Sequence, residues 1–279
     1  MNNNKVWFVT GASKGLGRSF VLQLLDQGYK VAATSRNLED LRKITTHDNF
    51  LPLSVDLKSE NSVKAAVDAT IQQFGSIDVL VNNAGFGQIG SLEELSDAEA
   101  RNSFDVNVFG LLNVTRAVLP HMRAQQSGHI FNISSIAGFT GAFPGFGIYC
   151  ATKFAVDGLS ESLFAEVKPF GIHVTIVSPG YFRTEFLSAG SLGIPAQPIA
   201  AYQSVRETQI AHQQQINGNQ AGDPEKAVAA VIGVAGAENA PLHLFLGEDA
   251  YGMAYQKMAA VESDLEAWKA VTIATAIAL

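Results

Sequence analysis

Tyr149 and Lys153 are the residues of this chain whose types and spacing point most directly to chemistry. They stand four positions apart in Tyr149-Cys150-Ala151-Thr152-Lys153, and on a helix this spacing places both side chains on one face. A free tyrosine has a pKa of about 10, and a neighbouring ammonium favours the phenolate. Such a pair would donate and accept a proton near neutral pH. The pair alone is a weak signal, because any helix can carry it by chance.

A glycine-rich loop near the beginning of the chain indicates a phosphate-binding turn. A short apolar, β-prone run leads into it, its glycines are Gly11, Gly15 and Gly17, and an amphipathic stretch follows. A dinucleotide-binding loop requires this strand-to-helix context, since glycine lets the backbone approach a pyrophosphate and the helix N-terminus offers free amides. An ordinary glycine-rich turn is the alternative interpretation of the loop alone.

Strand-like and helix-like stretches alternate along the chain, which is typical of a parallel sheet with helices on both faces. The predicted strands lie near residues 5–10, 30–35, 50–55, 77–82, 128–134, 172–178 and 241–246. We therefore predict an α/β fold, a Rossmann-like doubly wound parallel sheet of about seven strands. Residues 1–279 would form a single dinucleotide-binding domain that ends in a C-terminal helical extension over 249–279. Two helix starts are also expected, a capping box that begins at Ser96 and an N-cap at Asp223.

Residues 186–222 break this alternation with glycines, prolines and a polar, helix-like run. The segment follows the sixth strand, at the carboxyl edge where open α/β sheets bind ligands. Long irregular insertions in compact domains are usually functional or mobile. We predict that the segment is a substrate lid; a surface excursion without function is the alternative.

The composition limits the class of protein. The chain has 279 residues, 47% of them hydrophobic, which is enough for one substantial core. The formal net charge of −7 argues against a nucleic acid or an anionic membrane surface as partner. A single cysteine, Cys150, excludes an internal disulfide and suits a reducing compartment. With a polar N-terminus and an apolar tail too short to span a bilayer, the protein is expected to be cytoplasmic.

Several motifs together resemble those of the short-chain dehydrogenase/reductase family. The motifs that match in order and spacing are Thr10-Gly-x-x-x-Gly-x-Gly17, Asn82-Asn83-Ala84-Gly85, Ser135, Tyr149-x-x-x-Lys153 and Pro179-Gly180. The resemblance implies hydride transfer with a nicotinamide cofactor, and no metal is expected. It implies that Tyr149 is the acid/base and that Ser135 binds the same substrate oxygen. It further implies that Lys153 holds the nicotinamide ribose and that Asn107 anchors a water, which completes a catalytic set of four.

One spacing departs from the family pattern. The serine usually lies thirteen residues before the tyrosine, whereas Ser135 lies fourteen residues and Ser134 fifteen residues before Tyr149. The Ser-x-x-Gly pattern that ends at Gly138 favours Ser135, which places a one-residue insertion in the loop 139–148. Ser134 is then a structural hydroxyl at the end of a strand.

The end of the second strand bears on the choice of cofactor. An enzyme that prefers NAD usually has an acid there, which accepts hydrogen bonds from the ribose. This chain has Ser35 followed by Arg36, and a guanidinium binds a 2′-phosphate in bidentate fashion. Lys14 in the glycine loop would add a second cation, so we predict NADP(H). Two solvated surface charges are the alternative.

The resemblance extends the cofactor site to other loops. Asp56 resembles an acid that contacts adenine, and Thr184 lies in a segment that holds the carboxamide, although capping or turn roles explain these two residues equally well. The predicted cofactor-binding residues are Gly11, Ser13, Lys14, Gly15, Leu16, Gly17, Arg36, Asp56, Leu57, Asn83, Ala84, Gly85, Tyr149, Lys153, Pro179, Gly180 and Thr184.

Aromatic residues gather in the loops that should wall the nicotinamide. They are Phe86, Phe139, Phe143, Phe146, Tyr181, Phe182 and Phe186. Together they indicate an apolar pocket in which Ser135 and Tyr149 are the few polar groups, and a role in the core is the alternative for each ring taken singly. We predict an NADPH-dependent carbonyl reductase or alcohol dehydrogenase that acts reversibly on a hydrophobic, fairly bulky ketone. A cofactor-binding redox sensor without turnover and a ketoacyl-thioester reductase are the alternatives.

The resemblance also implies an oligomer. The helices after the fourth and fifth strands, near 97–125 and 149–168, would pair with their copies across a two-fold axis. Phe104 and Leu111 are among the apolar positions at helical spacing in the first of these helices. We expect a homodimer or homotetramer, and the C-terminal helix would restrict assembly to a dimer.

Overall fold

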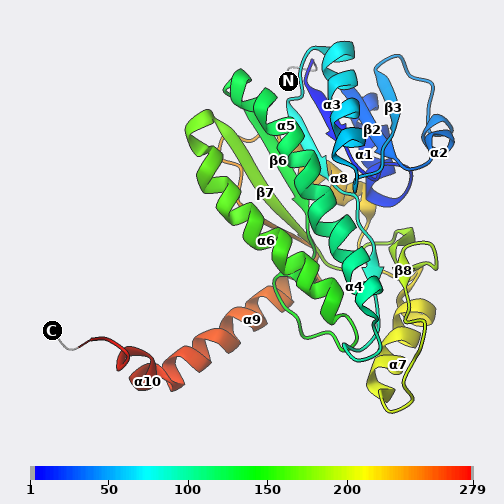
Figure 1. Ribbon diagram of the computed structural model, residues 1–279. Coiled ribbons are helices and arrows are strands. Elements are labelled where there is room, and N and C mark those ends of the chain that lie inside the picture. Colours follow the sequence, from blue (N-terminus) through cyan, green and yellow to red (C-terminus); the bar gives the residue numbers. More distant parts are fainter. Residues whose placement is uncertain (1–3, 278–279) are drawn as a thin grey trace.

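The computed structural model describes residues 4–277 and shows a seven-stranded sheet with helices on both faces (Figure 1). The strands are β1 (Val6–Val9), β2 (Lys30–Ser35), β3 (Phe50–Ser54), β4 (Val79–Asn82), β6 (Gly128–Ile133), β7 (Ile172–Pro179) and β9 (His243–Leu246). All are parallel, in the order β3-β2-β1-β4-β6-β7-β9. The chain reverses direction across the sheet between β1 and β4, which is the topological switch point of a doubly wound sheet. The predicted Rossmann-like fold is confirmed, and each predicted strand ends within about two residues of its observed limits.

Side chains alternate along the buried strands and divide the hydrophobic core into two layers. Trp7 and Val9 of β1 belong to one layer, whereas Phe8 between them belongs to the other. The first layer is covered by α1 (Gly15–Asp26) and α8 (Pro224–Val234). The helices over the second layer are α3 (Glu60–Phe74), α5 (Leu111–Gln125) and α6 (Gly147–Val167). Because both faces of the sheet are covered, the sequences of its strands are nearly continuous apolar runs.

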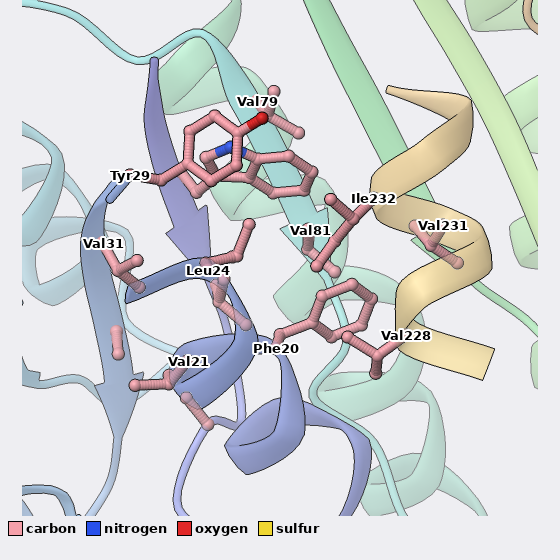
Figure 2. Close-up of a cluster of buried hydrophobic side chains, with 14 of the residues drawn as sticks. Phe20, Val21, Leu24, Tyr29, Val31, Val79, Val81, Val228, Val231 and Ile232 are labelled. Atoms are coloured by element: carbon pink, nitrogen blue, oxygen red, sulfur yellow. The ribbon is translucent and has the colours of Figure 1, made fainter. Parts of the chain in front are cut away.

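Helices α1 and α8 close the first layer together, as Figure 2 shows. Phe20 and Leu24 of α1 and Val228 and Ile232 of α8 are buried in one cluster with Val81 of β4. This packing fixes α1 with its N-terminus at the carboxyl edge of the sheet, directly after the glycine loop.

Both predicted helix starts are confirmed. The Ser96 hydroxyl accepts a hydrogen bond from the Glu99 backbone N–H, and the Glu99 carboxylate accepts one from the Ser96 N–H, at the beginning of α4 (Asp97–Phe104). The Asp223 carboxylate caps α8, where Pro224 occupies the first turn. A short helix after β2, α2 (Leu38–Arg42), completes the elements around the glycine loop.

The segment 186–222 is more regular than its sequence suggests. It contains the short strand β8 (Leu192–Gly193), which pairs in parallel with β5 (Gly87–Gln88), and the helix α7 (Gln203–Ile210). A π-helical turn, Ala211–Ile216, follows α7. These two-residue strands were not predicted, because so short a pair carries no periodic signal. They join the segment to the turn after β4 at the carboxyl edge of the sheet.

The predicted C-terminal extension consists of two helices, α9 (Glu248–Ala267) and α10 (Lys269–Ile273). Only the beginning of α9 packs on the domain, where Ala250 and Ala254 are buried, and the rest projects away from the sheet (Figure 1). Positions 278 and 279 of the predicted extension lie outside the described residues.

Candidate active site

The glycine loop between β1 and α1 is held against the turn after β4 by close backbone packing. Gly11 has a φ of +63°, and a Cβ added to it would lie 2.7 Å from the Cα of Ala84. A Cβ on Gly17 would lie 2.4 Å from the carbonyl oxygen of Gly11. The Thr10 hydroxyl accepts hydrogen bonds of 3.0 Å from the backbone N–H groups of Asn83 and Ala84. Only glycine fits at these two loop positions, so the turn after β4 and the beginning of α1 have fixed relative positions.

A cavity of about 570 Å³ runs along the carboxyl edge of the sheet. We call the part beside the glycine loop, Arg36 and Asp56 the glycine-loop end. The part lined by Phe143, Phe146, Tyr181, Phe182, Phe186 and His212 is called the aromatic end. The side chains of Ser135 and Tyr149 lie on the cavity wall as well. The cavity therefore brings together the loop expected to bind phosphate and the hydroxyls expected to handle a proton.

Most of the predicted site residues line this cavity. Those from the cofactor prediction are Gly11, Ser13, Lys14, Gly15, Leu16, Arg36, Asp56, Leu57, Asn83, Ala84, Gly85, Tyr149, Lys153, Pro179, Gly180 and Thr184. Three predicted residues do not line it. Gly17 packs α1 onto the loop, Asn107 lies behind Gly85, and Phe139 stacks edge-on against Phe245 at 5.2 Å between ring centroids. Phe139 belongs to a small cluster under the beginning of α9, so the prediction of a substrate contact there is not supported.

The cations at the glycine-loop end differ in what they contact. The Arg36 side chain is exposed and makes no hydrogen bond or ion pair within residues 4–277. The Lys14 ammonium instead crosses the cavity and donates hydrogen bonds to the Gly190 carbonyl, at 3.2 Å, and to the Ser191 hydroxyl, at 2.5 Å. Lys14 thus ties the glycine loop to the segment 186–222, while the Arg36 guanidinium is available to a ligand.

The carboxylates and the Thr184 hydroxyl near this end make hydrogen bonds with nearby backbone N–H groups. Asp56 accepts a hydrogen bond from the backbone N–H of Lys58, so it shapes its own turn as well as lining the cavity. The Thr184 hydroxyl accepts a hydrogen bond from the N–H of Phe186 and caps the short helical turn there. The Glu185 carboxylate, just before segment 186–222, accepts one of 3.2 Å from the N–H of Gly15, which is a second contact with the glycine loop.

Tyr149 and Lys153 lie one turn apart near the beginning of α6, and both are buried. The Lys153 ammonium lies 5.8 Å from the centroid of the Tyr149 ring and donates a hydrogen bond of 2.8 Å to the Ile133 carbonyl. Burial lowers the pKa of Lys153 to about 8. Burial also raises the pKa of Tyr149 above its ordinary value, and a hydrogen bond with Ser135 offsets only part of that rise. The expected lowering by Lys153 is not seen in this structure, where burial of the phenol is the main influence on its pKa.

The two serines at the end of β6 face different partners. The Ser135 hydroxyl lines the cavity beside Tyr149 and accepts a hydrogen bond from the Ala137 N–H. The Ser134 hydroxyl instead donates to the Asp157 carboxylate on α6. Burial raises the pKa of Asp157 to about 6, against the hydrogen bond from Ser134 and the charge of Lys153. The geometry gives Ser134 a structural contact and leaves Ser135 beside the phenol.

Asn107 lies in a π-helical stretch, Asp105–Gly110, between α4 and α5. Its side-chain oxygen accepts a hydrogen bond from the N–H of Phe86, and its amide nitrogen donates to the Phe86 carbonyl and to the Thr152 hydroxyl. The side chain is buried behind Gly85, where an added Cβ would lie 3.2 Å from the Asn107 oxygen. Asn107 therefore joins the turn after β4 to the helix that carries Lys153. A π-helical bulge at this place is typical of functional sites.

The comparisons with known proteins identify the family of the chain. The family described as short chain dehydrogenase matches residues 5–191. The chain belongs to the short-chain dehydrogenase family.

Its relatives give the activity in general terms. This short-chain dehydrogenase is 37% identical over 246 residues to a 3-ketodihydrosphingosine reductase of Bacteroides thetaiotaomicron, covering 87% of this chain and 88% of the relative. A crystal structure of a short-chain dehydrogenase from Streptomyces avermitilis is 38% identical, with a TM-score of 0.89 over 98% of this chain and 100% of that one. The protein is thus an oxidoreductase of this family.

A third similar protein bears on the cofactor. It is an alcohol dehydrogenase of the archaeon Thermococcus sibiricus, solved in complex with 5-hydroxy-NADP. It is 25% identical, with a TM-score of 0.70 over 87% of this chain and 95% of that one. A nicotinamide nucleotide is accordingly the cofactor class of this short-chain dehydrogenase, and the elongated cavity with its glycine loop suits such a molecule. Within residues 4–277 no cluster of three or more His, Cys, Asp or Glu side chains is arranged to hold a metal ion. No helix in the same range is long and apolar enough to cross a membrane.

Two buried polar residues at the aromatic end are among the cavity residues that were not predicted individually. His212 and Gln220 lie in the segment 186–222, are buried, and line the cavity. The Tyr181 hydroxyl lies 2.8 Å from Nε2 of His212, and the rings of His212 and Phe146 are 4.8 Å apart. The only sequence signal for them was the position of the segment after the sixth strand, since neither residue belongs to a motif.

Proposed function

We propose that this short-chain dehydrogenase is an NADPH-dependent oxidoreductase that reduces a hydrophobic ketone to a secondary alcohol, reversibly. The observation that carries the proposal is the course of one cavity, which extends from the unpaired guanidinium of Arg36 to the hydroxyls of Ser135 and Tyr149. Apart from Lys153 beside Tyr149, its charged groups gather at the glycine-loop end, while rings surround the hydroxyls. A charged cofactor and an apolar substrate would thus meet at Tyr149.

The catalytic roles follow from the positions of four side chains. The bound nicotinamide cofactor supplies or accepts the hydride. Tyr149 would give its proton to the carbonyl oxygen during reduction, and its raised pKa keeps the phenol protonated for this step. Ser135, hydrogen-bonded to the phenol, would donate to the same oxygen and stabilise the charge that develops there.

Lys153 and Asn107 would act beside this pair. The ammonium of Lys153 donates to the Ile133 carbonyl and lies close to Gly85, so its remaining protons are placed to bind ribose hydroxyls. Asn107 fixes the turn after β4 relative to α6 through its three side-chain hydrogen bonds, and would hold a water on the path from Lys153 to solvent.

The preference for NADPH rests on the glycine-loop end. No acid stands at the end of β2, where Ser35 hydrogen-bonds Ser13 and Arg36 follows. A 2′-phosphate there would gain a charge-assisted hydrogen bond from the guanidinium. The NADP derivative in the similar archaeal alcohol dehydrogenase supports the same choice.

The preference for a hydrophobic ketone rests on the aromatic end. Phe146 and Phe186 lie 6.1 and 5.7 Å from the Tyr149 ring, centroid to centroid. Burial of a ring-sized substrate group against such walls contributes about 1.5–3 kcal/mol. The similar 3-ketodihydrosphingosine reductase, by its name, acts on a ketone.

Two further properties belong to this proposal. Segment 186–222 would act as a substrate lid, supported by the hydrogen bonds of Lys14 to Gly190 and Ser191 and by the contact of the adjoining Glu185 with Gly15. The protein would be a homodimer or homotetramer, supported by large exposed apolar side chains at Phe109, Phe154 and Leu159 on the helices that would pair. Light scattering at micromolar concentration tests the assembly, and a monomer would contradict it.

A turnover screen tests the proposed function. Aryl and long-chain ketones, acetone and keto-sugars are offered with NADPH and with NADH. We expect kcat/KM for the bulky apolar ketones to exceed that for acetone or sugars by at least about tenfold, and NADPH to be preferred. Faster turnover of polyhydroxylated substrates than of every apolar ketone would contradict the pocket assignment.

A further inference from the structure

One buried polar group at the aromatic end has no partner. Among residues 4–277, the buried side-chain atoms without a hydrogen bond belong to Trp7, Asn82, Ser178, Arg206 and Gln220. Gln220 is the one among these that lines the cavity, and it is 3% exposed. Buried amide groups in folded proteins are nearly always paired, because an unpaired donor is costly. Nε2 of Gln220 is therefore a donor whose natural acceptor is a molecule bound in the cavity.

The rest of the Gln220 residue is fixed. Its side-chain oxygen accepts a hydrogen bond of 2.8 Å from the N–H of Gly218, and its backbone carbonyl accepts one of 3.1 Å from Nε of Arg183. The amide therefore cannot turn around without losing the bond to Gly218. This leaves both N–H groups of Nε2 as donors in a set orientation.

The neighbouring polar pair is already satisfied. Nδ1 of His212 lies 2.8 Å from the Thr208 carbonyl, so Nδ1 carries the proton and Nε2 accepts from the Tyr181 hydroxyl. Tyr181 and His212 thus use their polar atoms on each other and present rings to the cavity. At the aromatic end, Nε2 of Gln220 is left as the unpaired hydrogen-bond donor.

The rings at the aromatic end lead away from the hydroxyls of Ser135 and Tyr149. The ring of Phe146 lies 6.1 Å from Tyr149 on one side and 4.8 Å from His212 on the other, and His212 is 5.7 Å from Tyr181. Gly222, two residues after Gln220, is hydrogen-bonded to the Tyr181 carbonyl. A substrate whose carbonyl meets Tyr149 would run past Phe146 before it reaches Gln220.

The charges around this end favour a neutral acceptor. The Asp249 carboxylate accepts a hydrogen bond of 2.7 Å from the Tyr181 N–H, and it lines a second hollow together with Gln220. Of the cavity-lining cations, Lys14, Arg36 and Lys58 belong to the glycine-loop end, and Lys153 lies beside Tyr149. Arg183, whose Nε donates to the Gln220 carbonyl, offsets the charge of Asp249, so this end carries no excess positive charge to pair with a substrate carboxylate or phosphate.

We propose that Gln220 is a specificity-determining residue whose Nε2 donates a hydrogen bond to a neutral oxygen of the substrate, at the end remote from the reacting carbonyl. The inference rests on the proposed function and narrows its substrate class. The preferred substrate is an apolar ketone that carries a second, uncharged oxygen, as an ether, hydroxyl, amide or carbonyl group.

An oxygen scan tests this proposal. The probes are 2-dodecanone and its analogues in which one methylene, from position 5 outward, is replaced by an ether oxygen. The kcat/KM of each is measured with NADPH for the wild type, Gln220→Leu and Gln220→Glu. Gln220→Glu keeps an acceptor for the Gly218 N–H and removes both donors, so it remains informative if the leucine variant folds poorly. Gln214→Leu, at an exposed position of the same segment, is the matched control.

We expect the wild type to prefer an ether at one chain position over 2-dodecanone by at least about tenfold. This ratio should fall to near one in both Gln220 variants and persist in Gln214→Leu. A preference at no position, or one that survives in both Gln220 variants, overturns the inference and leaves the proposed function intact. If no ketone in the series turns over with either cofactor, the proposed function fails, and the inference fails with it.

Discussion

The glycine-loop end of the cavity is built from backbone packed against backbone, whereas side chains hold the aromatic end together. At the glycine-loop end, a Cβ on Gly11 would lie 2.7 Å from the Cα of Ala84, and the Thr10 hydroxyl binds two successive N–H groups. There the backbone amides that are expected to bind phosphate are positioned by strand order and by the absence of side chains. Little freedom remains for substitution at such positions.

The aromatic end depends on pairs of side chains from separate segments. Tyr181 is hydrogen-bonded to His212, and Arg206 of α7 forms an ion pair of 2.8 Å with the buried carboxylate of Glu94. The same carboxylate accepts a hydrogen bond of 2.7 Å from the Ile199 N–H. These contacts can be exchanged without disturbing the sheet, so one scaffold can keep its cofactor chemistry while its substrate changes.

Tyr149→Phe should have the largest effect, because it acts where the two ends meet. Loss of the proton donor should lower turnover by at least about 10²-fold, while the cofactor still binds, since the hydroxyl alone is removed. Turnover and cofactor affinity are measured on the same preparation, with Tyr251→Phe on the exposed face of α9 as control. Turnover near the wild-type value would refute the role of Tyr149.

Arg36→Ala should affect the glycine-loop end alone. Loss of a charge-assisted hydrogen bond to the 2′-phosphate costs about 1.5–3 kcal/mol, which corresponds to roughly 10- to 150-fold in affinity for NADPH. Affinity for NADH should hardly change, since it has no phosphate there. Arg42→Ala, on the exposed face of α2, removes a nearby charge and serves as control. Equal losses for both cofactors would mean that Arg36 does not recognise the phosphate.

The contrast between the glycine-loop end and the aromatic end explains which parts of the site could be predicted from the sequence. The strands, the glycine loop and the Tyr149–Lys153 pair have short-range signatures: apolar runs, fixed glycine spacing and helical periodicity. His212 and Gln220 have none, because their place in the cavity depends on how segment 186–222 folds back over the sheet. The place of Phe139 outside the cavity was hidden for a related reason, since its neighbour Phe245 lies more than 100 residues away. The raised pKa of Tyr149 depends on burial, which spacing does not reveal.

The pH dependence of reduction should report the buried ammonium of Lys153. Its pKa of about 8 in the folded protein lies below the ordinary 10.5, because burial disfavours the charged form. If the charged form holds the ribose, kcat/KM should be level below pH 8 and fall about tenfold per unit above it.

The effect of Lys153 on the free energy of unfolding has the opposite pH dependence. Between about pH 8 and 10.5 the unfolded chain binds one more proton than the folded chain, so Lys153 destabilises the folded protein less as the pH rises. The free energy of unfolding of the wild type and of Lys153→Met, measured across this range, tests the stability trend. A kcat/KM for reduction that rises through pH 8 would contradict the predicted rate profile.

Glu94→Gln should have the smallest effect and should be confined to the aromatic end. Burial alone would raise the pKa of Glu94, but hydrogen bonds from Ser91 and Ile199 and the charge of Arg206 lower it, so the carboxylate is ionised at neutral pH. Glutamine retains an acceptor for the backbone N–H groups but replaces a charge-assisted bond to Arg206 with a neutral one. The difference is about 0.5–1.5 kcal/mol, or roughly 2- to 12-fold.

This loss should appear as a higher KM for the ketone, because Glu94 anchors the segment that walls the substrate and touches neither Tyr149 nor the glycine loop. Affinity for NADPH and kcat at saturating ketone should stay near the wild-type values. Glu207→Gln, an exposed change on the same helix as Arg206, controls for lost charge. If Glu94→Gln weakened NADPH as much as the ketone, the two ends would be energetically coupled. The two ends would then be built from separate contacts, but the binding energies of NADPH and the ketone would not be independent.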